Sequence, residues 1–190
     1  MYEAHFGLRH NPFNRNLPGY VYQSPALAEA LAHLGYALDI RETFLLLTGE
    51  VGIGKTTAIQ ALVRQLPPET RVSVVNHTSL TPKELLVEIA RSFGVDCPRA
   101  ESKGGIVRRL EATLARERRG GGQALLVLDE AHLLSAAALE EIRLLSNLEL
   151  EGAKLLPICL VGQPELERRL RQSKLRSLRQ RVSVRYRLSP

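Results

Sequence analysis

Hydrophobic positions along the chain form two kinds of pattern, short continuous runs and longer stretches with helical spacing. The short runs predict strands buried in a sheet, at 44–47, 72–76, 124–128, 155–161 and 182–188. Between them, apolar residues recur every three or four positions and predict helices at 24–40, 57–66, 81–94, 106–118, 136–148, 165–171 and 174–180. Strands that alternate with helices indicate an α/β fold in which a central parallel five-stranded sheet is flanked by helices in three layers.

Several of these helices carry start signals. Ser24 and Pro25 have the order of an N-cap and a first helical residue, and Thr81 with Glu84 has the spacing of a capping box. Residues 1–23 are rich in aromatics, Gly, Pro and Asn, which predicts an irregular lead-in. We therefore expect one core domain over 24–190.

The first predicted strand runs into a glycine-rich turn that satisfies the pattern G-x-x-x-x-G-K-[ST]. The turn and the helix start consist of Gly49, Glu50, Val51, Gly52, Ile53, Gly54, Lys55, Thr56 and Thr57. Glycines let successive backbone N–H groups converge on a phosphate, and the helix adds its positive end. In this motif the lysine reaches the β and γ phosphates and the following Thr holds Mg²⁺. The stretch predicts a binding site for ATP or ADP with Mg²⁺, and the alternative is a plain strand-to-helix turn.

A second candidate motif ends the strand at 124–128. Asp129 follows this apolar run, and the carboxyl ends of strands line the ligand crevice of an open α/β sheet. We expect Asp129 to share with Thr56 the ligation of Mg²⁺, and Glu130 to orient or deprotonate an attacking water. Together with the glycine-rich turn, this pair predicts Mg-dependent ATP hydrolysis rather than binding alone.

Other residues near these motifs leave alternatives open. Residues 129–132 also spell the DEAH box of a helicase family, but 190 residues cannot hold two helicase cores, so His132 is interpreted as an ordinary turn residue. Gln163 ends the next strand and is either a polar group near the γ-phosphate or a turn residue before Pro164. Arg179 and Arg181 are either a finger that reaches the γ-phosphate of a neighbouring subunit or part of a solvated basic face.

The charge of the chain is concentrated near its end. The net charge is +6, but residues 163–190 contain nine of the 26 Lys and Arg residues and only two of the 20 Asp and Glu residues. Such a basic segment is a candidate surface for nucleic-acid phosphates. Cys97 and Cys159 have no zinc or CxxC spacing, and Cys159 is expected to be a buried thiol. With no leader and no long apolar stretch in the sequence, we expect a cytoplasmic domain.

The motifs resemble a known family. The stretches 49–57, 128–131, 144–149, 161–166 and 179–182 look like the AAA+ ATPase domain of the general secretion pathway protein A family, and so do 6–8 and 11–13. The resemblance implies a P-loop ATPase that works as a ring or another homo-oligomer. It gives Gln163 the sensor 1 place and Arg181, with Arg179 beside it, the arginine-finger region. It also implies that Phe13 and 20–24 lie near the adenine.

The same resemblance implies partners and a location. Family members usually continue into a helical lid, a membrane span and a periplasmic domain, so the whole protein would be anchored in the inner membrane beyond residue 190. Their ATP hydrolysis supports assembly of a secretion or pilus-like apparatus in the envelope. Related AAA+ proteins instead regulate DNA transposition, which is the alternative here. A third hypothesis is a nucleotide-gated interaction switch without useful turnover.

Overall fold

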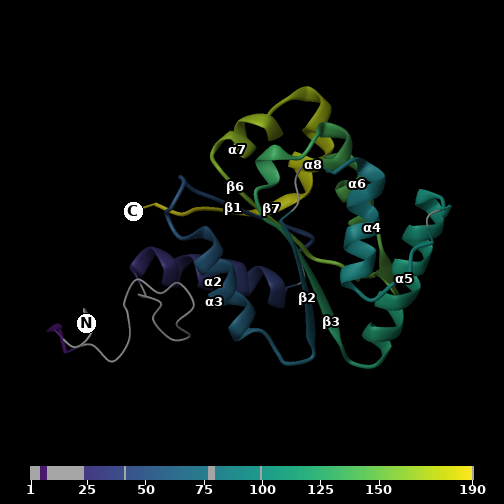
Figure 1. Ribbon diagram of the computed structural model, residues 1–190, viewed down its shortest axis with the longest axis horizontal. Helices are drawn as coiled ribbons and strands as arrows, with labels where there is room; N and C mark the ends of the chain where they lie inside the picture. Colours follow the sequence, from purple (N-terminus) through teal and green to yellow (C-terminus); the bar gives the residue numbers. More distant parts are fainter. Residues whose placement is uncertain (1–4, 8–23, 41, 77–79, 99, 190) are drawn as a thin grey trace.

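A central sheet of five parallel strands organises the chain (Figure 1). The computed structural model describes residues 5–7, 24–40, 42–76, 80–98 and 100–189. In spatial order the strands are β2 (Thr70–Val75), β3 (Gln123–Leu128), β6 (Ile158–Gly162), β1 (Phe44–Thr48) and β7 (Val182–Arg187). Every pairing in this sheet is parallel. The predicted five-stranded parallel sheet is therefore confirmed.

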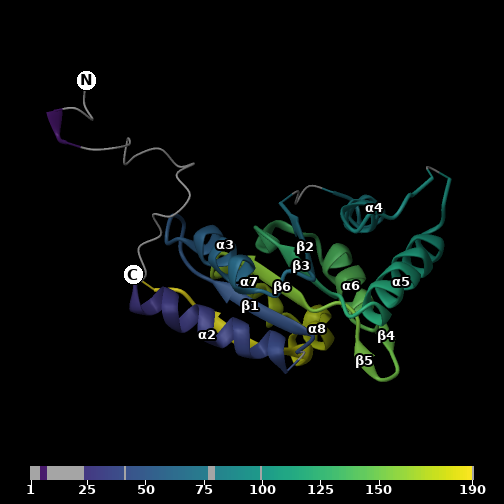
Figure 2. The same ribbon diagram turned by 90° about the horizontal axis from the view of Figure 1, so that it is seen from below.

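Helices cover both faces of the sheet and complete three layers (Figures 1 and 2). One face carries α2 (Pro25–Asp39) and α3 (Lys55–Gln65). The other carries α4 (Pro82–Ser92), α5 (Lys103–Arg119), α6 (Ala136–Leu145), α7 (Glu165–Leu170) and α8 (Arg176–Arg181). Short 3-10 turns, η1 (Ala131–Leu133) and η2 (Ser173–Leu175), precede α6 and α8.

The pleat of β1 explains why its apolar run is continuous. Phe44 and Leu46 pack into the core under α4–α8, whereas Leu45 and Leu47 pack into the core under α2 and α3. All five β1 residues are buried, because successive side chains of a strand point to opposite faces and both faces are covered.

The helix starts follow the expected chemistry. Ser24 Oγ accepts a hydrogen bond from Leu27 N at 3.1 Å, and Thr81 with Glu84 forms the predicted capping box. Some starts differ from their predictions: α3 begins at Lys55 instead of 57 and α8 at Arg176 instead of 174. The largest difference is at α5, which begins at Lys103 instead of 106, because Ser102 caps it and two glycines are tolerated in its first turn. Another difference is a small hairpin, β4 (Glu149–Leu150) and β5 (Ala153–Lys154), that precedes β6.

Most of the expected lead-in, including Phe13 and Tyr20, lies outside the described residues. No described helix combines the length and the apolar character that crossing a membrane requires.

Candidate functional site

The glycine-rich turn joins β1 to α3 at the carboxyl edge of the sheet. Gly52 and Gly54 have φ angles of 76° and 99°, a region that residues with a Cβ rarely adopt. Gly49 is required for another reason: a Cβ there would lie 2.8 Å from Ile53 Cγ2 and 3.0 Å from Leu188 O. The glycines therefore allow the tight backbone turn that a phosphate-binding loop requires.

Lys55 lies at the start of α3 and turns back over the loop. Its side chain is buried, and Nζ donates to Gly49 O at 2.9 Å and to Glu50 O at 2.8 Å. Both acceptors are neutral carbonyls, and no ion pair joins Lys55 to a carboxylate of the residues that the structure describes. A buried ammonium surrounded by loop backbone at the N-terminus of an 11-residue helix is a site for an anion.

The second motif meets the first at this edge. Asp129 follows β3, and Thr56 Oγ1 donates to Asp129 Oδ2 at 3.2 Å, although the two residues are 73 positions apart. A hydroxyl and a carboxylate oxygen are ligands that suit Mg²⁺, which takes only one or two groups from the protein when phosphates supply others. Among the described residues, no three His, Cys, Asp or Glu side chains gather as a metal cluster.

Glu130 has an unusual backbone. Its φ and ψ are 51° and 32°, and its N–H donates to Asp129 Oδ1 at 2.9 Å. The other described non-glycine residue with positive φ, Glu151, lies with Gly152 in the turn between β4 and β5, where a tight hairpin requires that conformation. No hairpin requires it at Glu130, and strained backbone of this kind is found where a side chain must be aimed.

The tip of β6 lies between the two motifs. Gly162 is paired with Thr48, and Gly49 N donates to Gly162 O at 3.2 Å. Gln163 therefore starts its turn beside both the glycine-rich loop and Asp129. The sequence had put the two motifs on one edge, but it had not indicated that β6 would separate β1 from β3.

The arginines of α8 are not brought to this edge. Val182, which follows Arg181, is paired with Phe44 at the start of β1, whereas Arg187 is paired with Thr48 at its end. At about 3.3 Å per residue, Arg181 lies roughly 16 Å from the glycine-rich loop of its own chain. Its Nη1 donates to Ser146 Oγ and Asn147 Oδ1, both at 2.7 Å, and to Arg143 O at 3.2 Å. Arg179 is half-buried beside it, and its carbonyl accepts a bond from Arg185.

The helix predicted at 165–171 is present as α7 and contacts both motifs, which the sequence did not indicate. Glu167 of α7 accepts a hydrogen bond from Thr48 Oγ1, just before the glycine-rich loop. Arg169 of the same helix donates to the carbonyls of His132 and Leu134, just after Asp129 and Glu130. The signal that could have found them is the pair of opposite charges on a short helix that follows Gln163.

The interior beneath the site is buried and apolar. Cys159 is fully buried at the centre of β6, and burial, together with the nearby charge of Asp129, raises its pKa to about 12. The predicted buried thiol is confirmed. Low polarity below the site strengthens electrostatic interactions at its surface.

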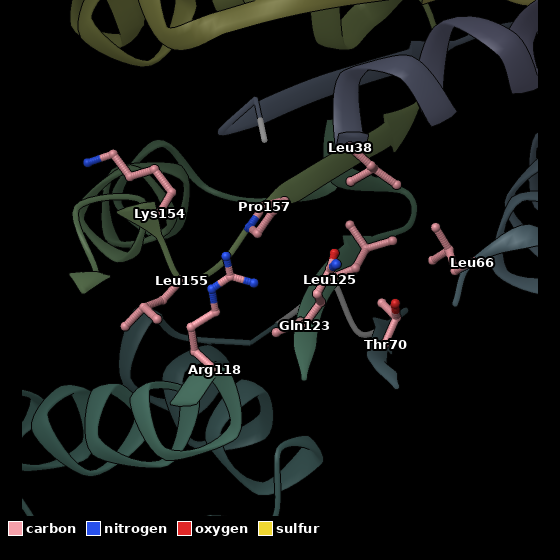
Figure 3. Close-up of a pocket in the computed structure, with 10 residues that line it drawn as sticks. Leu38, Leu66, Thr70, Arg118, Gln123, Leu125, Lys154, Leu155 and Pro157 are labelled. Carbon is pink, nitrogen blue, oxygen red and sulfur yellow. The ribbon is translucent and has the colours of Figure 1, made fainter. Parts of the chain in front are cut away.

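A pocket opens at the opposite, amino edge of the sheet (Figure 3). Thr70 and Gln123 begin β2 and β3 and line it, together with apolar residues that include Leu38 and Leu66. Arg118 of α5 and Lys154 of β5 lie on its other side (Figure 3). Because this pocket is a strand length away from Lys55 and Asp129, it is not part of the candidate nucleotide site.

Comparison with known proteins identifies relatives of the chain. It is 41% identical to general secretion pathway protein A of Aeromonas hydrophila over all of this chain and 35% of that protein. It is 33% identical over 57% of its length to 33% of the ATP-dependent target DNA activator B of Escherichia phage Mu. The chain thus spans about a third of the length of these curated relatives.

A solved structure shares the fold. The crystal structure of Cdc6p from Pyrobaculum aerophilum matches 92% of the chain, and the chain covers 48% of it, with a TM-score of 0.71 and 23% sequence identity. The family profile described as AAA domain matches residues 39–170, which contain the glycine-rich loop, Asp129, Glu130 and Gln163. The chain therefore belongs to the AAA domain family and is a P-loop nucleotide-binding domain of the AAA+ type.

Proposed function

We propose that this domain binds ATP with Mg²⁺, hydrolyses it to ADP and phosphate, and so supplies energy for assembly of a secretion or pilus-like apparatus in the cell envelope. The observation that carries the enzymatic part is the 3.2 Å approach of Thr56 Oγ1 to Asp129 Oδ2, next to the buried ammonium of Lys55. The glycine-rich loop and Asp129, which are far apart in the sequence, would thereby bind one magnesium-bound triphosphate from two sides.

Each residue has a role in this proposal. The backbone of 49–54 cradles the phosphates, Lys55 neutralises the β and γ oxygens, and Thr56 with Asp129 holds Mg²⁺. The metal, when bound, neutralises charge that develops on the phosphate oxygens. Glu130 accepts a proton from the attacking water, whose oxygen forms the new bond to the γ-phosphorus as the bond to the ADP oxygen breaks.

Gln163 and the arginines complete the proposed site. Gln163 starts from a strand tip between the two motifs, which suits an amide that senses the γ-phosphate. Arg181, with Arg179 beside it, lies at the far edge of its own sheet, so a finger role requires a neighbouring subunit. The proposed active form is therefore a homo-oligomer in which one protomer's Arg181 faces another protomer's phosphates.

The proposed role in the cell envelope is supported by the similarity to general secretion pathway protein A. General secretion pathway protein A is 41% identical over the whole chain, which supports a shared role for the domain. ATP is a cytoplasmic substrate, so the domain would act on the cytoplasmic side of the inner membrane with envelope components as partners.

The test of the enzymatic part is a single carboxylate change. Glu130→Gln keeps the size of the side chain but cannot accept a proton, so ATP binding should persist while phosphate release falls by about 10²-fold or more. Glu149→Gln, on the exposed hairpin, is the matched control and should release phosphate at the parent rate. Unchanged turnover in Glu130→Gln would remove Glu130 from the mechanism.

A second candidate function is DNA-dependent ATPase activity in transposition. It is favoured by similarity to a protein whose name is ATP-dependent target DNA activator B and by exposed arginines of the segment 163–190, among them Arg171, Arg176 and Arg185. A DNA filter-binding titration tests it, because phosphate contacts weaken steeply with salt. Absence of a salt-sensitive affinity would exclude this candidate and leave the first.

A further inference from the structure

His132, expected from the sequence to be an ordinary turn residue, lies in contact with the proposed general base. Its side chain is only 9% exposed, whereas the next residue, Leu133, is 58% exposed. Its Nδ1 lies 3.2 Å from Glu130 Oε2. Glu130 itself is 44% exposed, so the carboxylate meets the buried ring on one side and open solvent on the other.

The same nitrogen also faces the tip of β6. Gln163 N lies 3.4 Å from His132 Nδ1 with hydrogen-bond geometry. Gly162 leaves the room for this contact: a Cβ there would lie 3.2 Å from His132 N and 3.3 Å from His132 Nδ1. The imidazole is thus seated directly against the strand tip from which the proposed sensor, Gln163, starts.

The position of the ring is fixed from a third direction. Arg169 of α7 donates to the carbonyl of His132 and to that of Leu134, so the backbone of the turn is held at two points. The turn η1, the tip of β6 and α7 therefore determine together where the imidazole lies.

The two polar contacts of Nδ1 require opposite hydrogen positions. Nδ1 can accept from the Gln163 N–H only when it carries no hydrogen, and it can donate to the Glu130 carboxylate only when it carries one. The nitrogen therefore serves one partner at a time. When Nδ1 binds Gln163 N–H, it releases the Glu130 carboxylate and holds the start of the Gln163 turn. When Nδ1 binds the carboxylate, it retains Glu130 and the start of the Gln163 turn is held less tightly.

We propose that His132 is a positioning residue for Glu130. In the resting site its Nδ1 carries the ring hydrogen and donates to the carboxylate; when Glu130 turns to water, exchange with solvent leaves the ring hydrogen on Nε2, and Nδ1 accepts from the Gln163 backbone N–H. Its imidazole thereby links the general base to the sensor at the tip of β6. This inference rests on the proposed ATP hydrolysis, because Glu130 must be the base for its positioning to matter.

The direct test compares two substitutions of His132. His132→Leu keeps an apolar side chain of similar bulk and removes both polar contacts, whereas His132→Asn offers an amide that can donate to Glu130 or accept from Gln163. His132→Leu should lower kcat for phosphate release by about ten- to hundredfold with KM for ATP within about twofold, because misplacing a reacting group costs rate rather than binding. His132→Asn should recover most of the lost rate.

A control and a second background separate positioning from folding. His33→Leu removes a histidine that pairs with Glu29 on α2, at 3.8 Å and well exposed, and should leave turnover unchanged. In a Glu130→Gln background, His132→Leu should cause much less further loss of the residual rate, because the carboxylate that His132 positions is gone. A further equal loss in that background, or parent kcat in His132→Leu, would overturn the proposal.

A spectroscopic measurement keeps the proposal testable if His132→Leu fails to fold. The ¹⁵N signal of His132 Nδ1 should shift on Glu130→Gln in the nucleotide-free protein, because the carboxylate that draws the hydrogen to this nitrogen is lost. An unmoved signal would contradict the contact. A parent protein without turnover refutes the proposed hydrolysis, whereas turnover that His132→Leu leaves unchanged refutes the positioning role alone.

Discussion

The two edges of the central sheet use buried or half-buried cations in opposite ways. At the carboxyl edge, Lys55 donates only to carbonyls of its own loop, which are weak partners that a phosphate can replace. At the amino edge, Arg181 ties three acceptors at the end of α6 together. The comparison teaches that a cation held by neutral, local backbone is ready for a ligand, while one that joins two elements already stabilises the fold.

The largest effect is expected when Lys55 is removed. Lys55→Ala should weaken MgATP binding by roughly 3 kcal/mol, more than a hundredfold, because charge-assisted hydrogen bonds to the phosphates are lost. Lys154→Ala, at the amino-edge pocket, is the matched control and should bind MgATP as the parent does. Calorimetric titration measures both, and equal affinities in the two variants would contradict the anion site.

At the amino edge, we expect the loss of the cation to reduce the stability of the fold. Arg181→Ala should lower the free energy of unfolding by about 2 kcal/mol, because Ser146, which is buried, and Asn147 lose a charged donor. Arg176→Ala, on the exposed side of the same helix, should change it by less than about 0.5 kcal/mol. Urea unfolding of both variants is the measurement, and equal midpoints would remove the bracing role.

A mixing experiment separates bracing by Arg181 from its proposed role in a neighbour's site. Lys55→Ala and Arg181→Ala should each release little phosphate alone, and their mixture should regain turnover, because one protomer supplies the arginine and the other the loop. A mixture that gives only the sum of the two separate rates would argue that Arg181 acts only inside its own chain.

A smaller effect is expected from the buried interior of β6, in contrast to the exposed residues at the carboxyl edge. The thiol of Cys159 ionises at its ordinary value of 9.0 in the unfolded chain and at about 12 in the folded one. Above pH 9 the unfolded state therefore gains charge that the folded state cannot, and stability should fall by about 1.4 kcal/mol per pH unit up to about 12. Urea unfolding at pH 8 and pH 10 should show this loss in the parent relative to Cys159→Ala. Identical pH dependence in both would contradict the burial effect.

Much of the fold could be predicted because local patterns and packing agree in this chain. The continuous apolar runs at 44–47 and 124–128 lie in buried parallel strands, and the caps at Ser24 and Thr81 lie where the sequence predicted them. The early start of α5 was missed because two glycines in its first turn weaken the helical signal that Ser102 restores.

For the candidate site too, the residues with a local sequence signal could be predicted and the others could not. Gly49 to Thr57, Asp129 and Glu130 carry their signal in residue types at fixed spacing, so they could be named from the sequence. The contacts of Glu167 and Arg169 could not, because they depend on β6 lying between β1 and β3. The contact of His132 with Glu130 is local, but it occurs with a left-handed backbone at Glu130 that the residue types do not reveal. Strand order is a long-range property that no local pattern of this chain encodes.

The central claim is that Thr56 and Asp129 hold one magnesium ion on one triphosphate. A double-mutant cycle of Thr56→Ala and Asp129→Asn, read as ATP affinity in Mg²⁺ and again in EDTA, tests it most directly. The account predicts that in Mg²⁺ the double variant loses less than the sum of the single losses, by about 1 kcal/mol or more, and that this coupling vanishes in EDTA. Losses that add under both conditions would contradict it.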